Sequence, residues 1–371
     1  MRRIGSVKTW IAASIALGAA TAVPSQAAAD AMDPALARLV TGTGCRTAGP
    51  NGGSYYNPAS GFTKCKTDDA AFAKLIAQYG MAVAPTAMHS ARTTGFGGFE
   101  LAIEGDYTSI DSGASYWKKG TQGQQDPTTK NFSVQNPGPA SGLQLYEFKI
   151  RKGFPFGLEI TGDFGYLAQT SIYTIGADVR LSLFEGFRTG IPAIFPELAA
   201  GGSVRTTTGT DQFQLTVVGV DVELSKPIGI GGTVILTPYL GYQYLRIFGD
   251  SGLIDLTPNT DAVNYCGYAG NNTPASPDPT KSARDGQPVC KNGSSADFNN
   301  TVVFNPVRLN RHRMSGGLQL RFQMVMFGAK FAMDVVDPQD ANSGATKIDG
   351  KNPFEGVNRQ YTLAFDLGAV F

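Results

Sequence analysis

From Phe96 to the last residue, Phe371, the sequence repeatedly alternates apolar residues with polar or small ones at a period of two. In the segment FELAIEGDY, for example, Phe99, Leu101 and Ile103 share one face of an extended chain, and acidic residues share the other. A period of two is the repeat of a β-strand, because successive side chains point to opposite sides. About ten such segments follow one another along the chain, so the sequence predicts an all-β fold.

The connections between these segments differ in length in a regular way. Tight turns follow the second, fourth, sixth and eighth segments, whereas the connections 109–141, 249–306 and 337–357 are long. Alternation alone also fits a soluble β-sandwich, but tight turns on one side and long connections on the other are typical of a membrane barrel. We therefore predict an antiparallel transmembrane β-barrel of about ten strands, or twelve if the long connections hold a hairpin, with its tight turns in the periplasm.

The first residues carry the pattern of a secretory signal peptide. Arg2 and Arg3 precede an apolar, Ala-rich run that ends at Val23, and three alanines follow at 27–29. The run is shorter than the roughly 20 residues that a spanning helix needs. We therefore predict that residues 1–29 are a signal peptide and that the rest of the chain is exported by a Gram-negative bacterium.

Residues 30–94 differ from both flanking parts, because their apolar residues follow a helical period. In TDDAAFAKLIAQYG, Thr67 can cap a helix and Gly80 can end it. The segment DPALARLV begins with the Asp-Pro pair of a second helix start. We predict that residues 30–94 form a short, helical, plug-like element on the periplasmic side, packed on or in the mouth of a barrel over residues 95–371.

The four cysteines are expected to form disulfides. They are Cys45, Cys65, Cys266 and Cys290, an even number in an exported chain. Of the three possible connectivities, the local pairs Cys45–Cys65 and Cys266–Cys290 are preferred. Their spacing matches no zinc pattern and neither pair has a histidine nearby, so we predict no metal site and no cofactor.

Composition and motifs exclude several classes of function. Lys and Arg number 31 against 30 Asp and Glu, a balance that argues against a nucleic-acid partner. The two histidines offer no nucleophile–base pair, since His89 is expected outside the barrel, before the first strand, and His312 shares the apolar face of its strand. The chain carries no phosphate-binding loop or dinucleotide fingerprint. We predict that it is not an enzyme.

The last segment, YTLAFDLGAVF, alternates apolar residues and ends in phenylalanine. In this it resembles the closing strand of the single-chain β-barrel proteins of bacterial outer membranes. The resemblance implies an outer-membrane location, and an assembly signal that the barrel-insertion machinery reads. That signal consists of Tyr361, Leu363, Phe365, Leu367 and Phe371. Closure of the last strand on the first is also physically required, because an open sheet edge in lipid leaves backbone groups unsatisfied.

The polar face of the strands is expected to line the lumen, and it interleaves charges of both signs. The candidates are Glu100, Glu104, Asp106, Glu147, Lys149, Arg151, Glu159, Asp163, Asp178, Arg180, Asp221, Glu223, Arg313, Arg321, Lys330, Asp334 and Asp366. In the segment FQLTVVGVDVEL, Phe213 and Leu215 break the phase of the strand. In a narrow barrel these charges either pair and close the lumen or line a polar pore, and the sequence leaves both open.

The working prediction for function is a channel or transporter that allows small solutes to cross the outer membrane. The alternative is a closed structural or surface-interaction barrel that acts through its extracellular loop 249–306, stapled by Cys266–Cys290. The expected partners are the lipid bilayer, the insertion machinery, and a small solute or a surface ligand.

Overall fold

The computed structural model describes residues 30–41, 66–87, 89–124, 135–183, 195–255, 266–268, 288–290 and 301–371. The predicted signal peptide and the pair Cys45 and Cys65 lie outside the described residues. None of the described helices is long and apolar enough to cross a membrane.

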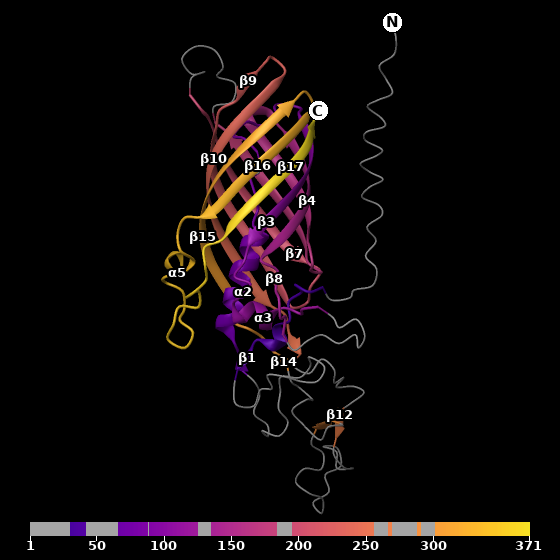
Figure 1. Ribbon diagram of the computed structural model, residues 1–371, viewed down its shortest axis with the longest axis vertical. Coiled ribbons are helices and arrows are strands. Elements are labelled where there is room, and N and C mark those ends of the chain that lie inside the picture. Colours follow the sequence, from indigo (N-terminus) through magenta and orange to yellow (C-terminus); the bar gives the residue numbers. More distant parts are fainter. Residues whose placement is uncertain are drawn as a thin grey trace, which may run out of the picture.

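Ten antiparallel strands form a closed barrel (Figure 1). They are β3 (Phe99–Ser109), β4 (Gly142–Gly153), β5 (Leu158–Leu167), β6 (Tyr173–Ser182), β7 (Glu197–Thr208), β8 (Phe213–Ser225), β10 (Val234–Ser251), β15 (Val307–Phe322), β16 (Val325–Asp334) and β17 (Tyr361–Val370). Each strand pairs with its neighbours along the chain, and β17 pairs with β3 to close the sheet. The closure extends to the last residue, because Phe371 and Phe99 exchange two backbone hydrogen bonds of 2.8 and 3.1 Å. The predicted fold class and strand number are confirmed.

The two ends of the barrel carry different connections. At one end, here called the tight-turn end, the connections are 154–157, 183–196, 226–233 and 323–324. At the other, the long-connection end, the connections 110–141, 252–306 and 335–360 are long, and 168–172 and 209–212 are short. Figure 1 shows the chain's C-terminus at the tight-turn end. The three connections predicted to be long are long in the structure, whereas 183–196, at the tight-turn end, is longer than the tight turn expected there.

Short elements surround the barrel strands. They are η1 (Leu36–Arg38), β1 (Val40–Thr41), β2 (Lys66–Thr67), α2 (Asp69–Ala82), α3 (Ser115–Gly120), η3 (Pro155–Gly157), β9 (Ile228–Ile230), β11 (Ile254–Asp255), β12 (Cys266–Tyr268), β13 (Pro288–Cys290), β14 (Thr301–Val302) and α5 (Pro338–Ala341). Strands β12 and β13 pair so that Cys266 stands opposite Cys290 in the register. A disulfide between them stays a prediction.

Helix α2 is built differently from the expectation. Its N-cap is Asp68 rather than Thr67, and the Asp68 side chain accepts a 3.0 Å hydrogen bond from the Ala71 backbone N–H. The helix also continues past Gly80 to Ala82. A methyl group at Gly80 would lie 2.6 Å from Ile247 Cγ2 on β10, so this glycine allows close packing rather than ending the helix.

The described part of the N-terminal element lies at the long-connection end of the barrel. The helix predicted in the segment DPALARLV is a single 3₁₀ turn, η1. It lies with α2 and α3 at the long-connection end (Figure 1). Residues 83–87 and 89–98 then lead from α2 through the lumen to β3, which starts at the tight-turn end. The two expectations, tight turns in the periplasm and a periplasmic N-terminal element, therefore do not hold together, and the side of the membrane on which this element lies stays a prediction.

An apolar core closes the long-connection end. Phe72, Leu75 and Ile76 of α2 are fully buried against inward-facing wall residues, among them Leu215 and Leu245. The same pattern explains the apparent break of phase in β8. Its inward face runs through Leu215 and on to the acidic residues without interruption, and it is apolar where α2 covers it. Burial of these side chains holds the helix in the mouth of the barrel.

Candidate functional site in the barrel lumen

The structure places nearly all of the predicted lumen residues inside the barrel. Those buried are Glu100, Glu104, Asp106, Glu147, Lys149, Arg151, Glu159, Asp163, Arg180, Asp221, Glu223, Arg313, Lys330, Asp334 and Asp366. Asp178 is half-buried. Arg321 is exposed beside the β15–β16 turn, where its Nε donates to the carbonyl of Gln323 at 3.1 Å, so it does not line the closed lumen.

Ion pairs between neighbouring strands fill much of the lumen wall. Lys149 Nζ lies 2.7 Å from Glu104 Oε2 and 3.4 Å from Glu147 Oε2. Arg151 in the same way contacts Glu100 at 2.7 Å and Glu159 at 3.4 Å. Each of these cations bridges two carboxylates. Such pairing is expected, because an unpaired buried charge is costly.

The opposite wall carries a second set of pairs. Arg180 contacts Asp221 at 3.0 Å and also pairs with Glu223. Lys330 lies 3.6 Å from Glu223, which links β16 to this set. The charges of this wall are therefore shared among three strands, β6, β8 and β16.

Two buried arginines of the lumen are absent from the sequence candidates. Arg205 on β7 contacts Glu147 at 2.8 Å and Asp163 at 3.0 Å. Arg311 on β15 pairs with Asp334 at 3.1 Å. Both follow the period-two phase of their strands, which is the signal that could have found them. The small residues around Arg205 made its strand weak in the sequence.

A segment of the chain itself passes through this charged interior. We call residues 83–87 and 89–94 the luminal segment. Arg205 Nη1 donates to the carbonyls of Val83 and Ala84 at 3.4 and 3.3 Å, and Lys149 Nζ donates to the Thr86 carbonyl at 3.3 Å. Lys330 reaches the Ala87 carbonyl. Wall cations thus satisfy the backbone of a segment that has no secondary structure of its own.

Further along, the luminal segment makes contacts of the opposite polarity. The backbone N–H of Thr94 donates to Glu159 Oε2 at 2.7 Å, and that of Ala91 donates to Ser225 Oγ at 3.1 Å. His89 lies in this part and is 3% exposed, with its Nδ1 3.1 Å from the Ser90 carbonyl oxygen. The expectation that His89 lies outside the barrel, before the first strand, is wrong, because the chain enters the lumen before that strand begins.

A buried polar hub holds α2 against α3 in the mouth. Gln78 is fully buried, its Nε2 donates to the Tyr116 hydroxyl at 2.7 Å, and its Oε1 accepts from Trp117 Nε1 at 2.6 Å. The Tyr79 hydroxyl donates to the Met32 carbonyl. Burial, helped by the charge of Asp33, raises the pKa of the Tyr79 phenol well above its usual value, so it stays a neutral donor.

Two cavities of very different size lie among the described residues. A cavity of about 10 Å³, lined in part by Ala87, Glu223 and Lys330, has room for about one water molecule. A larger hollow of about 470 Å³ opens at the long-connection end, between Lys66, Asp69 and Asp349. Of these two cavities, the roomier one therefore lies at the long-connection end and not among the charged residues of the lumen wall.

Comparisons with known proteins give no family and only distant structural similarity. No family model matches the chain, and a search of curated proteins finds no match. Among solved structures, the chain is similar to Ail, the attachment invasion locus protein of Yersinia pestis, with 10% identity over 74% of this chain and 99% of Ail and a TM-score of 0.25.

Two further structures show similarity of the same kind. The β domain of the Bordetella autotransporter BrkA has 9% identity over 73% of this chain and 98% of its own, with a TM-score of 0.33. The outer membrane protein OprG from Pseudomonas aeruginosa has 9% identity over 76% and 99%, with a TM-score of 0.24. At these scores the assignment of a barrel rests on the strand pairing of this chain itself.

Proposed function

We propose that this chain is an outer-membrane β-barrel whose lumen is closed by its own luminal segment and which acts through the surface of its long-connection end. The occupied lumen carries this proposal. Wall cations bind the carbonyls of the luminal segment, and α2 fills the mouth behind it. The geometry thus favours the closed surface barrel over the open channel.

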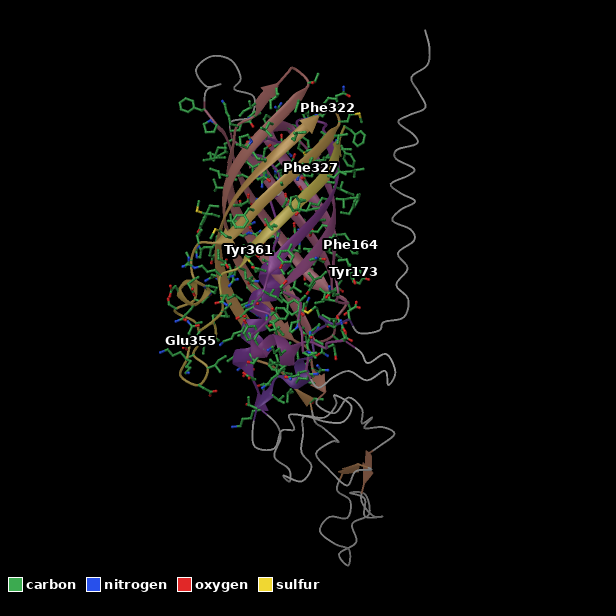
Figure 2. The ribbon with its side chains drawn as sticks, in the orientation of Figure 1. Phe164, Tyr173, Phe322, Phe327, Glu355 and Tyr361 are labelled. Atoms are coloured by element: carbon green, nitrogen blue, oxygen red, sulfur yellow. The ribbon has the colours of Figure 1, made fainter. Side chains whose placement is uncertain are left out.

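The outer face of the strands supports a membrane location. Exposed apolar residues such as Ile103, Phe164 and Leu367 face outward all around the barrel. Figure 2 shows Phe322 and Phe327 toward the tight-turn end, and Tyr361 and Tyr173 nearer the other end. A soluble protein buries such residues, whereas lipid solvates them, and aromatic residues gather at the two membrane interfaces.

The long-connection end supports a role in binding at the surface. It carries the three long connections and the hollow of about 470 Å³. Connection 252–306 includes the paired strands β12 and β13, with Cys266 opposite Cys290. Long loops on a rigid scaffold are where binding sites commonly lie.

Passage of small solutes is kept as a second candidate function, on one observation. Wall side chains hold the luminal segment through its backbone groups, and among the described residues none of the sheets includes it. The wall charges also pair among themselves. Withdrawal of the segment would therefore leave the ring of strands unbroken and its charged lumen open, as a gated solute path needs.

Single-channel conductance in a planar bilayer separates the two functions. The mature protein, residues 30–371, and a variant that lacks residues 30–94 are refolded, and their folding is checked by heat-dependent mobility in electrophoresis. We expect the mature protein to be silent. Stable conductance by the mature protein would refute the proposal that the luminal segment closes the lumen. Conductance by the shortened variant alone would support the gated path.

An epitope inserted at 270–280 tests the orientation. Labelling of intact cells by an antibody to the epitope is expected, because the proposal places the long-connection end outside the cell. Labelling that requires a permeabilised outer membrane would place this end in the periplasm and refute the surface role. An epitope in the 226–233 connection, at the tight-turn end, is the matched control and should give the reverse result.

A further inference from the structure

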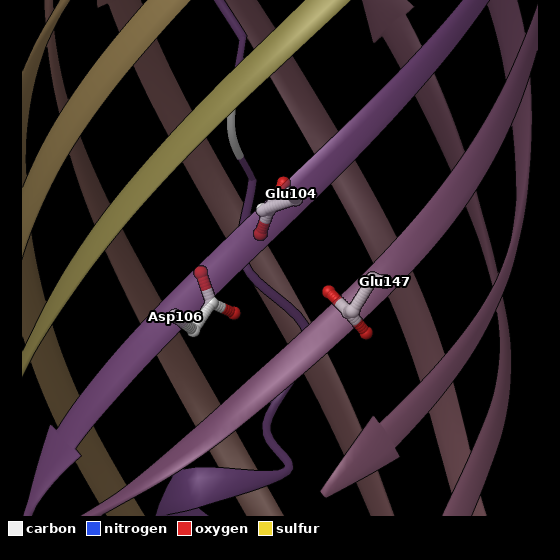
Figure 3. Close-up of side chains that lie close together, drawn as sticks. All are labelled: Glu104, Asp106 and Glu147. Atoms are coloured by element: carbon white, nitrogen blue, oxygen red, sulfur yellow. The ribbon is translucent and has the colours of Figure 1, made fainter. Parts of the chain in front are cut away.

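Three carboxylates meet in the lumen wall near the middle of the barrel (Figure 3). Glu104 and Asp106 project from β3, and Glu147 projects from the adjacent strand β4. All three are buried, with exposures of 1%, 4% and 2%, and one oxygen of each lies within 4.8 Å of one oxygen of the others. The sequence analysis named all three as lumen residues but predicted no metal site.

The cations nearby leave one of these carboxylates unbalanced. Lys149 is shared between Glu104 and Glu147, and Arg205 is shared between Glu147 and Asp163. Among the described residues, neither carboxylate oxygen of Asp106 has a hydrogen-bond partner. A buried, ionised carboxylate without a partner is strongly disfavoured, so Asp106 needs either a further positive charge beside it or a proton of its own.

The next guanidinium along the wall does not supply that charge by contact. Arg313 donates through Nε to Gln243 at 2.6 Å and also binds the Pro85 carbonyl. These bonds direct it to the luminal segment and away from a direct ion pair with Asp106. The third nitrogen of this guanidinium, Nη1, has no hydrogen-bond partner among the described residues, so it does not bond to Asp106 either.

A hydroxyl outside the trio faces the same region. Thr174 on β6 is fully buried, and its Oγ1 has no hydrogen-bond partner among the described residues. It lies across Gly165, where a methyl group would come within 2.5 Å of Thr174 Oγ1 and 3.1 Å of Glu147 Cγ. The missing side chain at Gly165 brings this unpartnered oxygen beside Glu147.

We propose that Glu104, Asp106 and Glu147 bind one divalent cation of the Ca²⁺ or Mg²⁺ kind inside the barrel, with Thr174 as a neighbouring oxygen. The donors are all oxygens, which hard divalent cations prefer, and softer metals that favour Cys or His ligands find none among these four residues. Thr86 of the luminal segment hydrogen-bonds to Glu104. The ion would therefore lie beside the segment and help to hold it. The site is independent of the function proposed above.

The test is a count of bound ions on the refolded mature protein. The protein is refolded in detergent with equal Ca²⁺ and Mg²⁺, passed over a desalting column and analysed by native mass spectrometry and elemental analysis. We expect about one divalent ion per chain. Asp106→Asn keeps the shape of the side chain and removes its charge, and we expect it to lose the ion.

Asp366→Asn is the matched control, because Asp366 is another buried lumen carboxylate with an unpartnered oxygen but lies outside the trio. It should keep the ion. Absence of any divalent ion from the wild-type protein refutes the proposal, whether or not Asp106→Asn folds. An ion retained by Asp106→Asn refutes it as well. A wild-type protein without an ion, combined with a more heat-stable Asp106→Asn, would show that Asp106 instead carries a proton.

Discussion

The contact between α2 and β10 gives the sharpest test of how the mouth is closed. Gly80 of α2 faces Ile247 of β10, and Gly249 of β10 faces Ile76 of α2. A methyl group at Gly80 would lie 2.6 and 2.8 Å from two Ile247 carbons, and one at Gly249 would lie 2.4 Å from Ile76 Cγ2. Each isoleucine thus fills the space that a glycine on the other element leaves.

This arrangement reverses the usual effect of replacing a helical glycine. In the interior of a helix, alanine is about 1 kcal/mol more favourable than glycine. Overpacking by a methyl group costs about 1–3 kcal/mol. Gly80→Ala should therefore be neutral to destabilising by about 2 kcal/mol for the seated helix. In the Ile247→Ala background the clash is gone, and the same change should stabilise by about 1 kcal/mol.

The free energy of opening of α2 is measured by hydrogen–deuterium exchange of its backbone amides in the refolded protein. The four proteins of the cycle are the wild type, the two single variants and the double variant. We expect a coupling of about 1–3 kcal/mol between the two sites. Ile247→Ala alone should lower the protection of α2, because it leaves a cavity beside the helix.

Equal stabilisation of α2 by Gly80→Ala in both backgrounds would refute this account, since it would mean that Gly80 and Ile247 do not touch. Gly162→Ala is the control, because a methyl group at Gly162 meets nothing within 4 Å. Its effect on exchange should be the same with Ile247 and with Ile247→Ala. The control separates a specific clash from a general response of the barrel to added methyl groups.

Three further predictions concern other parts of the barrel. Arg205→Met leaves the buried charge of Glu147 with one cation fewer, and should destabilise the fold by about 3–5 kcal/mol, seen as a lower temperature of barrel unfolding in electrophoresis; an unchanged temperature would mean that the pair is not buried. Removal of Phe371 deletes the backbone bonds that end the seam between β17 and β3, and should lower the yield of folded protein in the outer membrane, while an unchanged yield would exclude Phe371 from the assembly signal. Ile175→Arg on the outward face should cost about 2–4 kcal/mol in a bilayer, measured by denaturant unfolding in vesicles, whereas Leu253→Arg near the long-connection end should cost little; equal costs would argue against a lipid-facing belt.

The barrel was predictable from sequence because its physical rules are local. Period two places every second residue of a strand on the same face, so Glu104 and Asp106 could be assigned to the interior without knowledge of any contact. The same rule reaches Arg205 and Arg311, but only once the bounds of their strands are known. Closure of the last strand on the first follows from the absence of water in lipid.

The contents of the lumen were not predictable in the same way. The segment AVAPTAMHSARTT at 82–94 has no periodicity, and it is held by wall side chains that are distant in the sequence. In the sequence, Gly80 fits either the end of a helix or a close contact between the helix and another element. Only its contact with Ile247 on β10 decides between the two. Phe213 looked out of phase because the helix that covers its face lies elsewhere in the chain.

The path of the luminal segment constrains the order of assembly. The segment leads directly into β3, one of the two strands at the seam, while α2 and the residues before it lie at the far end of the barrel. In the proposed orientation, the N-terminal part must therefore travel from the periplasm to the cell surface. It can do so readily only before β3 and β17 pair, because wall side chains of the closed barrel hold the luminal segment in place. In this order of assembly, β17 pairs with β3 only after the luminal segment lies in the lumen. Membrane insertion, delivery of the N-terminal part to the outside and closure of the sheet are then one coupled step.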